Sequence, residues 1–501
     1  MSGNLFQRVR DAVTDTDRPL IRPPGRLLLS FADCFAIAAR FAHVLVRHGV
    51  VPGDRVAVQV EKSPNALCLY LACLRAGAVY LPLNTGYTPS ELAYFASDAE
   101  PKVFVCAGRN LEKVSAALPP LTFLTLDDDG EGGSLVQEAA SLPADFPDAA
   151  VTTSDLASIL YTSGTTGRSK GAMLTHGNLY SNAESLKHAW RFTADDVLLH
   201  ALPIFHIHGL FVAINITLVS GASMILLPKF DLDAIFRELP QATVMMGVPT
   251  FYTRLLGDAR LDPDVTRTIR LFVSGSAPLL AETHREWQAK TGHAILERYG
   301  MTETNMNTSN PYDGLRLPGS VGLPLPGVEL RIANKEGTVL PQGEIGLIEV
   351  RGPNVFKGYW RMPEKTKSEF RDDGFFITGD LGRIDDKGYV HILGRDKDLI
   401  ISGGFNVYPK EIESLIDELP GVVESAVIGL PHRDFGEGVT ACVVTAKGAA
   451  LTEKDVLNAL TDRLAKFKHP KRVLFVEDLP RNTMGKVQKA RLRDEHKDLY
   501  A

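Results

Sequence analysis

The sequence contains few cysteines, and their positions match no metal-binding or redox motif. There are five, an odd number, and they lie among apolar neighbours at Cys34, Cys68, Cys73, Cys106 and Cys442. Zinc sites and redox-active pairs require closely spaced cysteines, which this arrangement lacks. We therefore predict reduced thiols in the protein core, as is typical of cytoplasmic proteins.

The sequence also lacks a strong excess of charge of either sign. Its 54 Lys and Arg against 60 Asp and Glu give a net charge of -6, which provides no basic field for nucleic acid or anionic membranes. No stretch approaches the roughly 18 consecutive apolar residues of a membrane-spanning helix. The N-terminus shows no apolar core followed by a cleavage site of small residues. We expect a cytoplasmic protein with a small-molecule substrate, no nucleic-acid partner and no membrane attachment.

The apolar residues that are present follow alternating helical and strand-like patterns in the first part of the chain. A chain of 501 residues exceeds what one hydrophobic core can hold, so several domains or subdomains are expected. Helices are predicted at 31–50, 65–77 and 89–100, and strands at 54–60, 78–84 and 101–106. This alternation is typical of layered α/β domains in which helices cover a mostly parallel sheet.

Two segments interrupt this pattern. Residues 120–153 are acidic and rich in Gly, Pro and Ala, so we predict a surface connection there rather than a core element. A Gly- and charge-rich passage at 394–409 is followed by a new pattern, with helices predicted near 410–419 and 453–465 and strands near 424–430, 439–446 and 472–479. A domain boundary is therefore predicted between Gly394 and Asp398.

A loop at 161–171 carries groups that bind phosphate. Within residues 158–179 it follows a predicted strand and precedes a predicted helix, and its hydroxyl donors are Thr162, Ser163, Thr165, Thr166 and Ser169. Its glycines let backbone N–H groups approach an anion, and Lys170 adds a positive charge. The loop differs from a Walker A motif, because Lys170 lies three residues past Gly167. The composition favours phosphate contact over a flexible polar turn, but it does not name a reaction.

Five segments, in order, resemble the signatures of the adenylate-forming superfamily of acyl-CoA synthetases, luciferases and peptide-synthetase adenylation domains. They are YTSGTTGRSKG (161–171), ERYGMTE (297–303), ITGD (377–380), GRDKDLIISGGFNVYPKEIE (394–413) and LPRNTMGKVQK (479–489). The resemblance covers almost the whole chain. It implies an α/β protein with a large N-terminal domain (1–394) of layered αβ subdomains with mostly parallel sheets, a hinge (395–398), and a small mobile C-terminal α+β domain (399–501).

The resemblance also implies a site for ATP and Mg²⁺. The β- and γ-phosphates are expected against Thr162, Ser163, Gly164, Thr165, Thr166, Gly167 and Lys170, and Mg²⁺ against Thr165 and Glu303. The rest of the nucleotide is expected against Ser276, Ala277, Glu297, Arg298, Tyr299, Gly300, Met301 and Thr302. Asp380 is expected to accept hydrogen bonds from the ribose hydroxyls, with Arg395 close by.

The C-terminal signatures imply the remaining catalytic parts. Lys486 matches the family's catalytic lysine, where an ammonium group stabilises the negative charge that develops as a carboxylate meets the α-phosphate. Lys397 matches the hinge residue. Ser402, Gly403 and Gly404 are expected to face coenzyme A in the thioester step, which needs no dedicated base because a thiol is already a good nucleophile. A lysine acetyltransferase and a deacetylase acting on Lys486 would switch adenylation off and on.

Four further segments resemble the malonyl-CoA synthetases within this superfamily. They are HALPIFHIHGL (200–210), PKFD (228–231), MGVPTFYTRLL (246–256) and YGMTETNMNTSNPYDG (299–314). The resemblance implies ligation of malonate, and also of methylmalonate, to coenzyme A. Arg254 is then expected to pair with the second carboxylate, and His206, His208 and Ser276 to lie near the acid. On the sequence alone, Arg254 fits a solvent-facing helix arginine equally well.

Three alternatives remain open. The first is a synthetase for another short acid, such as acetate or propionate. The second is an adenylation enzyme that loads a separate carrier protein. The third is a regulator that binds ATP or acyl-CoA without catalysis, although the joint presence of Lys486, Glu303 and Asp380 argues against it.

Overall fold

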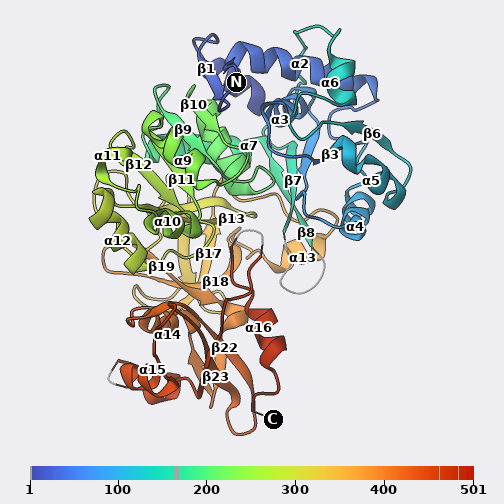
Figure 1. Cartoon of the computed structure of the whole chain (residues 1–501). Coiled ribbons are helices and arrows are strands. Elements are labelled where there is room, and N and C mark those ends of the chain that lie inside the picture. Colours follow the sequence, from blue (N-terminus) through green and yellow to red (C-terminus); the bar gives the residue numbers. More distant parts are fainter. Residues whose placement is uncertain (1–2, 163–168, 462, 483–484, 501) are drawn as a thin grey trace.

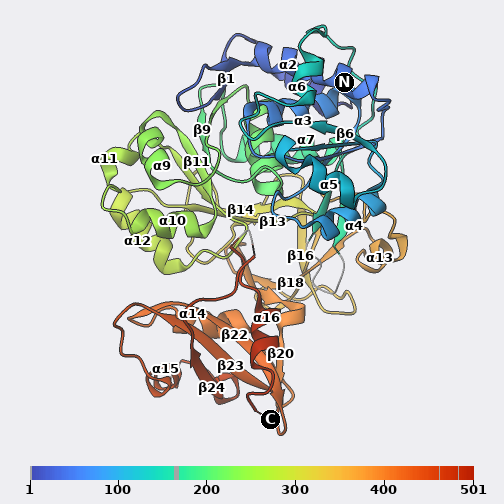
Figure 2. The same ribbon diagram turned by 45° about the vertical axis from the view of Figure 1, so that its right-hand side comes forward.

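The computed structural model of the chain describes residues 3–162, 169–461, 463–482 and 485–500. The strands form four sheets of nine, six, four and five strands. Figures 1 and 2 both show the sheet formed after residue 400, coloured orange to red, in a separate body beneath the larger N-terminal part. This is the layered α/β organisation that the sequence predicts, with a second and smaller α+β body.

The six-stranded sheet has the order β6-β5-β3-β4-β7-β8, in which β8 is antiparallel and the other neighbours are parallel. Its strands are β3 (Arg55–Gln59), β4 (Val79–Pro82), β5 (Val103–Cys106), β6 (Thr122–Thr125), β7 (Leu156–Thr162) and β8 (Lys170–Thr175). Helix α2 (Phe31–Arg47) precedes β3, and the helices between the strands are α3 (Pro64–Ala76), α4 (Pro89–Ala99), α5 (Leu111–Ala117) and α6 (Ser134–Ala139). The elements predicted between residues 31 and 106 are confirmed.

The nine-stranded sheet has the order β15-β14-β13-β12-β11-β9-β10-β1-β2. Its strands are β1 (Pro19–Arg22), β2 (Leu29–Ser30), β9 (Val197–His200), β10 (Ser223–Leu226), β11 (Val244–Gly247), β12 (Leu271–Ser274), β13 (Leu296–Met301), β14 (Asn305–Ser309) and β15 (Leu323–Pro324). Strands β9 to β13 are mutually parallel. Because parallel strands end at one edge, the segments that follow His200, Gly247, Ser274 and Met301 meet there.

In the described ranges, helices and one π-helix precede or connect the strands of the nine-stranded sheet. They are α1 (Leu5–Ala12), α7 (His176–Ala189), the π-helix η2 (His208–Ile214), α8 (Asn215–Val219), α9 (Leu232–Glu238), α10 (Pro249–Leu256), α11 (Pro263–Thr266) and α12 (Ala281–Thr291). One apolar core includes side chains from both large sheets, among them Val56 of β3 and Leu198 of β9. The two sheets therefore form one packed body.

The third sheet is antiparallel and precedes the smaller body. It contains β16 (Glu329–Ala333), β17 (Gly346–Arg351), β18 (Phe376–Ile384) and β19 (Val390–Arg395), with α13 (Pro363–Ser368) before β18. A short 3-10 helix, η4 (Asp396–Asp398), joins β19 to the fourth sheet. The predicted hinge at 395–398 coincides with this connection, while the domain bounds themselves stay a prediction.

The fourth sheet is covered on both faces. Its strands are β20 (Ile400–Ser402), β21 (Phe405–Val407), β22 (Val422–His432), β23 (Gly436–Thr445) and β24 (Arg472–Phe475), and its helices are α14 (Pro409–Ile416), α15 (Glu453–Leu460) and α16 (Lys489–His496). Along β22, Val427 belongs to one apolar cluster, whereas Ala426 and Ile428 belong to another. This alternation follows from successive side chains pointing to opposite faces of a strand.

Two sequence-based expectations are wrong. Residues 120–153 are not only a surface connection, because they include the edge strand β6 and helix α6, with Leu124 and Leu135 buried. The loop at 163–168 does not lead directly into a helix, because β8 intervenes and pairs antiparallel with β7 before α7 begins at His176. Strands β6 and β8 are only partly buried and so have a weak apolar pattern, whereas the short strands β4 and β5 are buried along their whole length.

The five cysteines are free and buried, as predicted. Within the described ranges, no helix combines the length and apolar character needed to cross a membrane.

Candidate active site

The phosphate-loop segment lies between the paired strands β7 and β8. Thr162 faces Lys170 across this hairpin, and its hydroxyl donates to the Lys170 carbonyl oxygen at 3.4 Å. Lys170 Nζ lies 3.4 Å from Glu369 Oε1 and 4.1 Å from the centre of the Tyr359 ring. The remaining predicted phosphate ligands lie outside the described residues, so their contacts stay a prediction: Ser163, Gly164, Thr165, Thr166 and Gly167.

Glu303 is a buried carboxylate beside Tyr359. The Tyr359 hydroxyl lies 3.0 Å from Glu303 Oε1 and 2.6 Å from Glu369 Oε2. A phenol carries one proton, so it donates to one of these carboxylates at a time. Burial raises the pKa of Glu303. The network links Glu303 to Glu369 and, through that residue's ion pair, to Lys170.

The donor set around Glu303 fits Mg²⁺ that is bound together with phosphate. The described residues include no cluster of three His, Cys, Asp or Glu side chains able to hold a metal by themselves. Mg²⁺ differs from structural metals because it takes one or two carboxylates and completes its shell with phosphate oxygens and water. A single buried carboxylate near the predicted phosphate-binding loop meets that requirement.

Asp380 links two of the predicted site residues. It lies on β18 opposite Arg395 on β19, and its Oδ1 forms an ion pair with Arg395 Nε at 2.7 Å. Its Oδ2 accepts a hydrogen bond from the Tyr299 hydroxyl at 2.5 Å. The Asp380 charge raises the pKa of Arg395. The structure therefore brings Asp380, Arg395 and Tyr299 together, while ribose binding stays a prediction.

A second polar group lies beyond the carboxyl ends of β9 and β12. The Ser276 hydroxyl is 3.1 Å from Nδ1 of the buried His208, and Ser276 has a φ of 72°. A positive φ is costly for a residue with a side chain, and such strain is concentrated at functional sites. Burial, followed by the charge of Arg298, lowers the pKa of His208 well below its ordinary value. His208 is therefore a neutral imidazole at pH 7.

Arg298 is a buried guanidinium that lacks an acidic partner in the described part of the chain. It packs so closely on Gly275 that an added Cβ there would lie 2.4 Å from Arg298 Cζ. Its Nε and Nη2 atoms have no hydrogen-bond partner among the described residues. Burial lowers its pKa to about 9. A buried cation left unpaired is costly, so this position favours an anionic ligand.

The other residues of this segment are packed within the protein. The Glu297 carboxylate accepts a hydrogen bond from the Leu279 backbone N–H at 3.2 Å, and burial raises its pKa to about 8. A Cβ on Gly300 would lie 1.9 Å from the Asn305 carbonyl oxygen, so β13 and β14 approach closely there. The remaining predicted nucleotide contacts are partly buried: Ala277, Met301 and Thr302.

Lys486 lies close to the charged groups of the N-terminal part. The surrounding protein, followed by the Arg395 guanidinium, lowers its pKa, although the residue keeps exposed surface. The charges of Asp380, Glu303 and Arg298 also act on its ammonium group. The predicted catalytic lysine therefore faces the residues that sequence motifs assign to the nucleotide site.

The turn that carries Lys486 is fixed locally and lies against helix α10. The Lys486 backbone N–H donates to Asn482 Oδ1 at 3.0 Å. A Cβ on Gly485 would lie 3.7 Å from Thr250 Cγ2, at the first turn of α10. Arg254 lies one helical turn after Thr250 and thus on the same face of α10. It is exposed, with its guanidinium 5.7 Å from the centre of the Phe230 ring.

His206 lies near Lys486. It is partly buried, and its ring lies 5.7 Å from that of Phe205. Burial, followed by the Lys486 charge, lowers the pKa of His206 to about 4. The segment after β9 therefore brings two neutral imidazoles, His206 and His208, to the edge where Lys486 and Arg298 lie.

The predicted hinge is tied to both bodies. Asp396 pairs with Lys335 of the N-terminal part at 3.3 Å, and Asp398 pairs with Arg493 of helix α16 at 2.9 Å. Lys397, between them, is exposed. The structure thus assigns the residues on either side of Lys397 to different bodies.

The predicted coenzyme A contacts form a tight turn. Ser402 ends β20, and Gly403 and Gly404 connect it to β21 with φ values of 58° and 81°. Two positive φ values define a type of hairpin turn that glycine adopts readily. The Gly403 backbone N–H donates to the Phe435 carbonyl oxygen within the same body.

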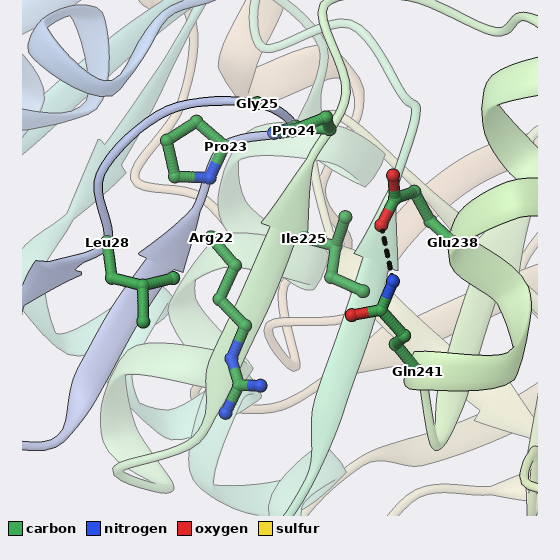
Figure 3. A pocket seen from close by; sticks show the side chains of 8 residues that line it. All are labelled: Arg22, Pro23, Pro24, Gly25, Leu28, Ile225, Glu238 and Gln241. Carbon is green, nitrogen blue, oxygen red and sulfur yellow. Dashed lines mark hydrogen bonds between the residues drawn. The ribbon is translucent and has the colours of Figure 1, made fainter.

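A separate cavity of about 380 Å³ lies at the far edge of the nine-stranded sheet (Figure 3). Arg22 and Leu28 lie on one side of it, and the Glu238 carboxylate accepts a hydrogen bond from Gln241 at 3.0 Å on the other. None of the predicted site residues lines this cavity. It is therefore not part of the site.

Tyr359 and Glu369 are site residues that sequence reasoning missed. They lie in no recognised signature, and their contacts reach Glu303 and Lys170, 56 and 199 residues away in sequence. The aromatic pair Tyr359-Trp360 after Gly358 is the sole local signal, and it fits a core position equally well. Contacts between distant segments leave no local pattern.

The arrangement of charged side chains suits a reaction between two anionic reactants. Three cations, Lys486, Arg298 and Arg395, lie near the carboxylates Asp380 and Glu303. Cations preorganised in a partly buried site stabilise negative charge that develops in a transition state. Such a site can hold two anionic reactants together.

Comparisons with known proteins agree with this arrangement. Residues 10–360 match the AMP-binding enzyme family, and residues 411–486 match the AMP-binding enzyme C-terminal domain. The chain is 36% identical to malonate–CoA ligase of Arabidopsis thaliana, over 98% of this chain and 89% of that protein. It is 63% identical to MatB from Rhodopseudomonas palustris and covers 100% of both chains, with a TM-score of 0.98 to the ATP-bound crystal structure and 0.88 to the apo structure.

Over the whole chain, the structure is thus more similar to the ATP-bound form of that relative than to its apo form. The family match covers most of the chain and includes both bodies. It also spans the segments that carry Lys170, Arg298 and Glu303 in one body and Lys486 in the other. The chain belongs to the AMP-binding enzyme family, whose adenylate-forming signatures the sequence carries.

Proposed function

We propose that this protein is an AMP-forming acid–CoA ligase that joins malonate to coenzyme A through a malonyl-adenylate. The observation that carries the proposal is the buried guanidinium of Arg298, which lacks an acidic partner in the described residues and lies close to Lys486. A dicarboxylate presents one carboxylate for activation and a second one that requires a cation. Methylmalonate has the same two groups, and we include it as a further substrate.

In the first half-reaction, a malonate carboxylate oxygen attacks the α-phosphorus of ATP, and the bond to pyrophosphate breaks. Lys486 holds the two anions together and stabilises the charge of the transition state. Lys170 and the 162–170 loop hold the leaving pyrophosphate, and Asp380 binds the ribose. Glu303 and Thr165 would hold Mg²⁺, which neutralises phosphate charge when bound.

In the second half-reaction, the coenzyme A sulfur attacks the acyl carbon, and AMP leaves. We propose that rotation about Lys397 withdraws Lys486 and presents Ser402, Gly403 and Gly404 to coenzyme A. The ion pairs on either side of Lys397, to different bodies, support this pivot. The glycine turn supports it as well, because bare backbone allows close approach of a narrow ligand.

The sequence motifs assign Arg254 to the second carboxylate of malonate and Arg298 to the nucleotide. We propose instead that Arg298 is the main partner of that carboxylate and that Arg254 contributes less. Arg298 is buried without an acidic partner among the described residues, whereas Arg254 is exposed. A charge-assisted pair in a buried position is stronger than one in solvent. His206 and His208, both neutral, then face the acid as hydrogen-bonding groups.

A substrate panel tests the proposal. Protein with ATP, Mg²⁺ and coenzyme A is assayed for pyrophosphate and acyl-CoA with malonate, methylmalonate, acetate and propionate. Malonate is expected to give the highest kcat/KM. Arg298→Gln is expected to reduce kcat/KM for malonate about 100-fold, as breaking a buried charge pair costs ~3 kcal/mol, and to affect acetate less.

Arg254→Ala reports the contribution of the exposed arginine, and Arg267→Ala, at another exposed arginine, is the control expected to match wild type. Equal activity with acetate and malonate would overturn the malonate assignment and leave acid activation in place. Transfer to a carrier protein without acyl-CoA formation would overturn the role of coenzyme A.

We further propose that acetylation of Lys486 by a lysine acetyltransferase stops adenylation and that a deacetylase restores it. Lys486 keeps exposed surface, so a modifying enzyme can reach it, and acetylation removes the charge that holds the two anions. Protein carrying acetyl-lysine at Lys486 is expected to lose at least ~100-fold in pyrophosphate release. Protein with acetyl-lysine at the exposed Lys454 is the control. Unchanged pyrophosphate release by protein with acetyl-lysine at Lys486 would refute the proposal.

We place the protein in the cytoplasm. Its five cysteines are free and buried, and thiols persist in reducing compartments. Cell fractionation followed by immunodetection checks this placement, and recovery with the membrane pellet contradicts it.

A further inference from the structure

A buried lysine outside the predicted site lies between the two large sheets. Lys62 follows β3 and precedes α3, and its residue exposure is 8%. Its ammonium group contacts the end of β9, which belongs to the other sheet. Within the described ranges no Asp or Glu pairs with it, and burial lowers its pKa well below the ordinary value. Either protonation state of the amine retains at least two N–H donors.

The hydrogen-bond partners of Lys62 all lie in one short segment. Nζ donates to the Leu202 carbonyl oxygen at 2.7 Å and to the His200 carbonyl oxygen at 3.3 Å, and it lies 3.3 Å from His200 Nδ1. Buried carbonyl groups require donors. Lys62 therefore satisfies the backbone at the point where β9 ends and the segment that carries His206 begins.

The contacts of His200 define its tautomer. His200 Nε2 lies 2.8 Å from the Gly209 carbonyl oxygen, and a carbonyl only accepts, so Nε2 carries the proton. Burial, followed by the Lys62 charge, lowers the pKa of His200 to about 3, so its Nδ1 is unprotonated and accepts from Lys62. Hydrogen bonds thus run from Lys62 through His200 to Gly209.

This chain of bonds connects the two ends of segment 200–209. The segment also folds tightly on itself, since a Cβ on Gly209 would lie 2.0 Å from the Pro203 carbonyl oxygen. Between these ends lie His206, near Lys486, and His208, whose ring contacts Ser276. The position of both imidazoles therefore depends on the bonds that close the segment.

We propose that Lys62 is a positioning residue for acid binding, which holds segment 200–209 through His200 so that His206 and His208 face the acid. Lys62 does not touch substrate. The inference rests on the proposed function, because that function places the acid beside these two histidines. If Lys62 contributed only to stability, Lys62→Met would lower the melting temperature but would not raise KM for the acid more than KM for ATP.

Lys62→Met tests the inference, since it keeps an unbranched apolar side chain of nearly the same length and removes its donors. The variant is expected to raise KM for malonate about tenfold and to keep KM for ATP within twofold of wild type. The reason is that the displaced segment carries the predicted acid contacts, whereas it reaches the predicted nucleotide contacts only through Ser276. Lys187→Met is the matched control. Its Nζ also donates to a backbone carbonyl, of Val219 at 3.0 Å, away from the segment.

A double-mutant cycle tests the path through His200. If Lys62 acts through His200, Lys62→Met and His200→Phe each raise KM for malonate, and the double variant raises it no more than the larger single effect. Additive effects would show that Lys62 acts without His200 and would overturn the proposed path.

Histidine ¹⁵N spectra of the wild-type protein provide a measurement that does not depend on the folding of a variant. His200 is expected as the Nε2–H tautomer between pH 6 and 8. Finding the Nδ1–H tautomer, or equal increases in KM for malonate and for ATP in Lys62→Met, would overturn the inference. Wild-type protein that fails to turn over malonate would instead contradict the proposed function, and the spectrum would still report on the hydrogen bonds.

Discussion

Removal of the single hydroxyl group of Tyr359 should alter the site measurably. Its hydroxyl contacts Glu303 and Glu369, and its donated hydrogen bond lowers the pKa of Glu303 against the larger opposing effect of burial. Tyr359→Phe removes that donor and keeps the ring. The pKa of Glu303 then rises further, so the ionised carboxylate is lost at a higher pH.

We therefore expect the acid limb of the rate profile of Tyr359→Phe to shift to higher pH, with kcat reduced about tenfold at neutral pH. Pyrophosphate release measured against pH and Mg²⁺ concentration checks this. Tyr389→Phe is the control, because that hydroxyl donates to the Leu315 carbonyl oxygen instead. A profile identical to wild type would remove Tyr359 from the site.

Residues in ordered motifs could be predicted, whereas residues that act through distant contacts could not. Glu303, Asp380 and Lys486 stand in segments whose spacing resembles a family pattern. Lys62 and Tyr359 acquire their roles from partners 138 and 56 residues away. A buried lysine has the same sequence signal as a solvated one, so only the fold distinguishes them.

Helix α12 contains a buried imidazole that should make stability depend on pH. His284 has a residue exposure of 1%, and both ring nitrogens lack a hydrogen-bond partner among the described residues. Burial, followed by the Arg316 charge, lowers its pKa to about 4. Between pH 6.5 and 4 the unfolded chain binds a proton at this residue that the folded chain does not. The free energy of unfolding therefore decreases as the pH is lowered through this range.

The slope from one such histidine is about 1.4 kcal/mol per pH unit. His284→Leu is expected to remove this slope and to raise the free energy of unfolding by about 1 kcal/mol at pH 7, because it also removes two unsatisfied polar atoms. Denaturant unfolding at several pH values checks both. His188→Leu, at an exposed side chain of α7, is the control, and equal slopes in the two variants would contradict the prediction.

Elements with a clear apolar pattern were predicted correctly, including the four-residue strands β4 and β5, whereas β6, α6 and β8 were not. Helices α2, α3 and α4 follow clear patterns and begin at the capping residues Ser30, Ser63 and Thr88. Strand β8, in contrast, has six residues and an irregular burial pattern. It is a strand because it pairs with β7, and such pairings outweigh local propensity.

At the scale of the whole molecule, a cross-link between the bodies should separate the two half-reactions. Gly485 approaches Thr250, and the native cysteines are buried. Thr250→Cys combined with Gly485→Cys places two thiols within reach of a disulfide. The oxidised protein is expected to retain ATP–pyrophosphate exchange and to lose at least 90% of acyl-CoA formation (~1.4 kcal/mol), because the small body cannot rotate.

Reduction should restore acyl-CoA formation, which distinguishes the cross-link from damage to the site. The single variant Gly485→Cys controls for the strain of a side chain at a φ of 73°. Acyl-CoA formation at the wild-type rate in the cross-linked protein would show that both half-reactions use one arrangement.

The ion pairs around Lys397 have a mechanical consequence. With Asp396 bound to Lys335 and Asp398 bound to Arg493, the freedom between the bodies is concentrated in the φ and ψ torsions of one residue. A joint with two torsions describes a surface rather than a volume of orientations. Two distances measured between pairs of labels on the two bodies should therefore suffice to report the state of the whole protein.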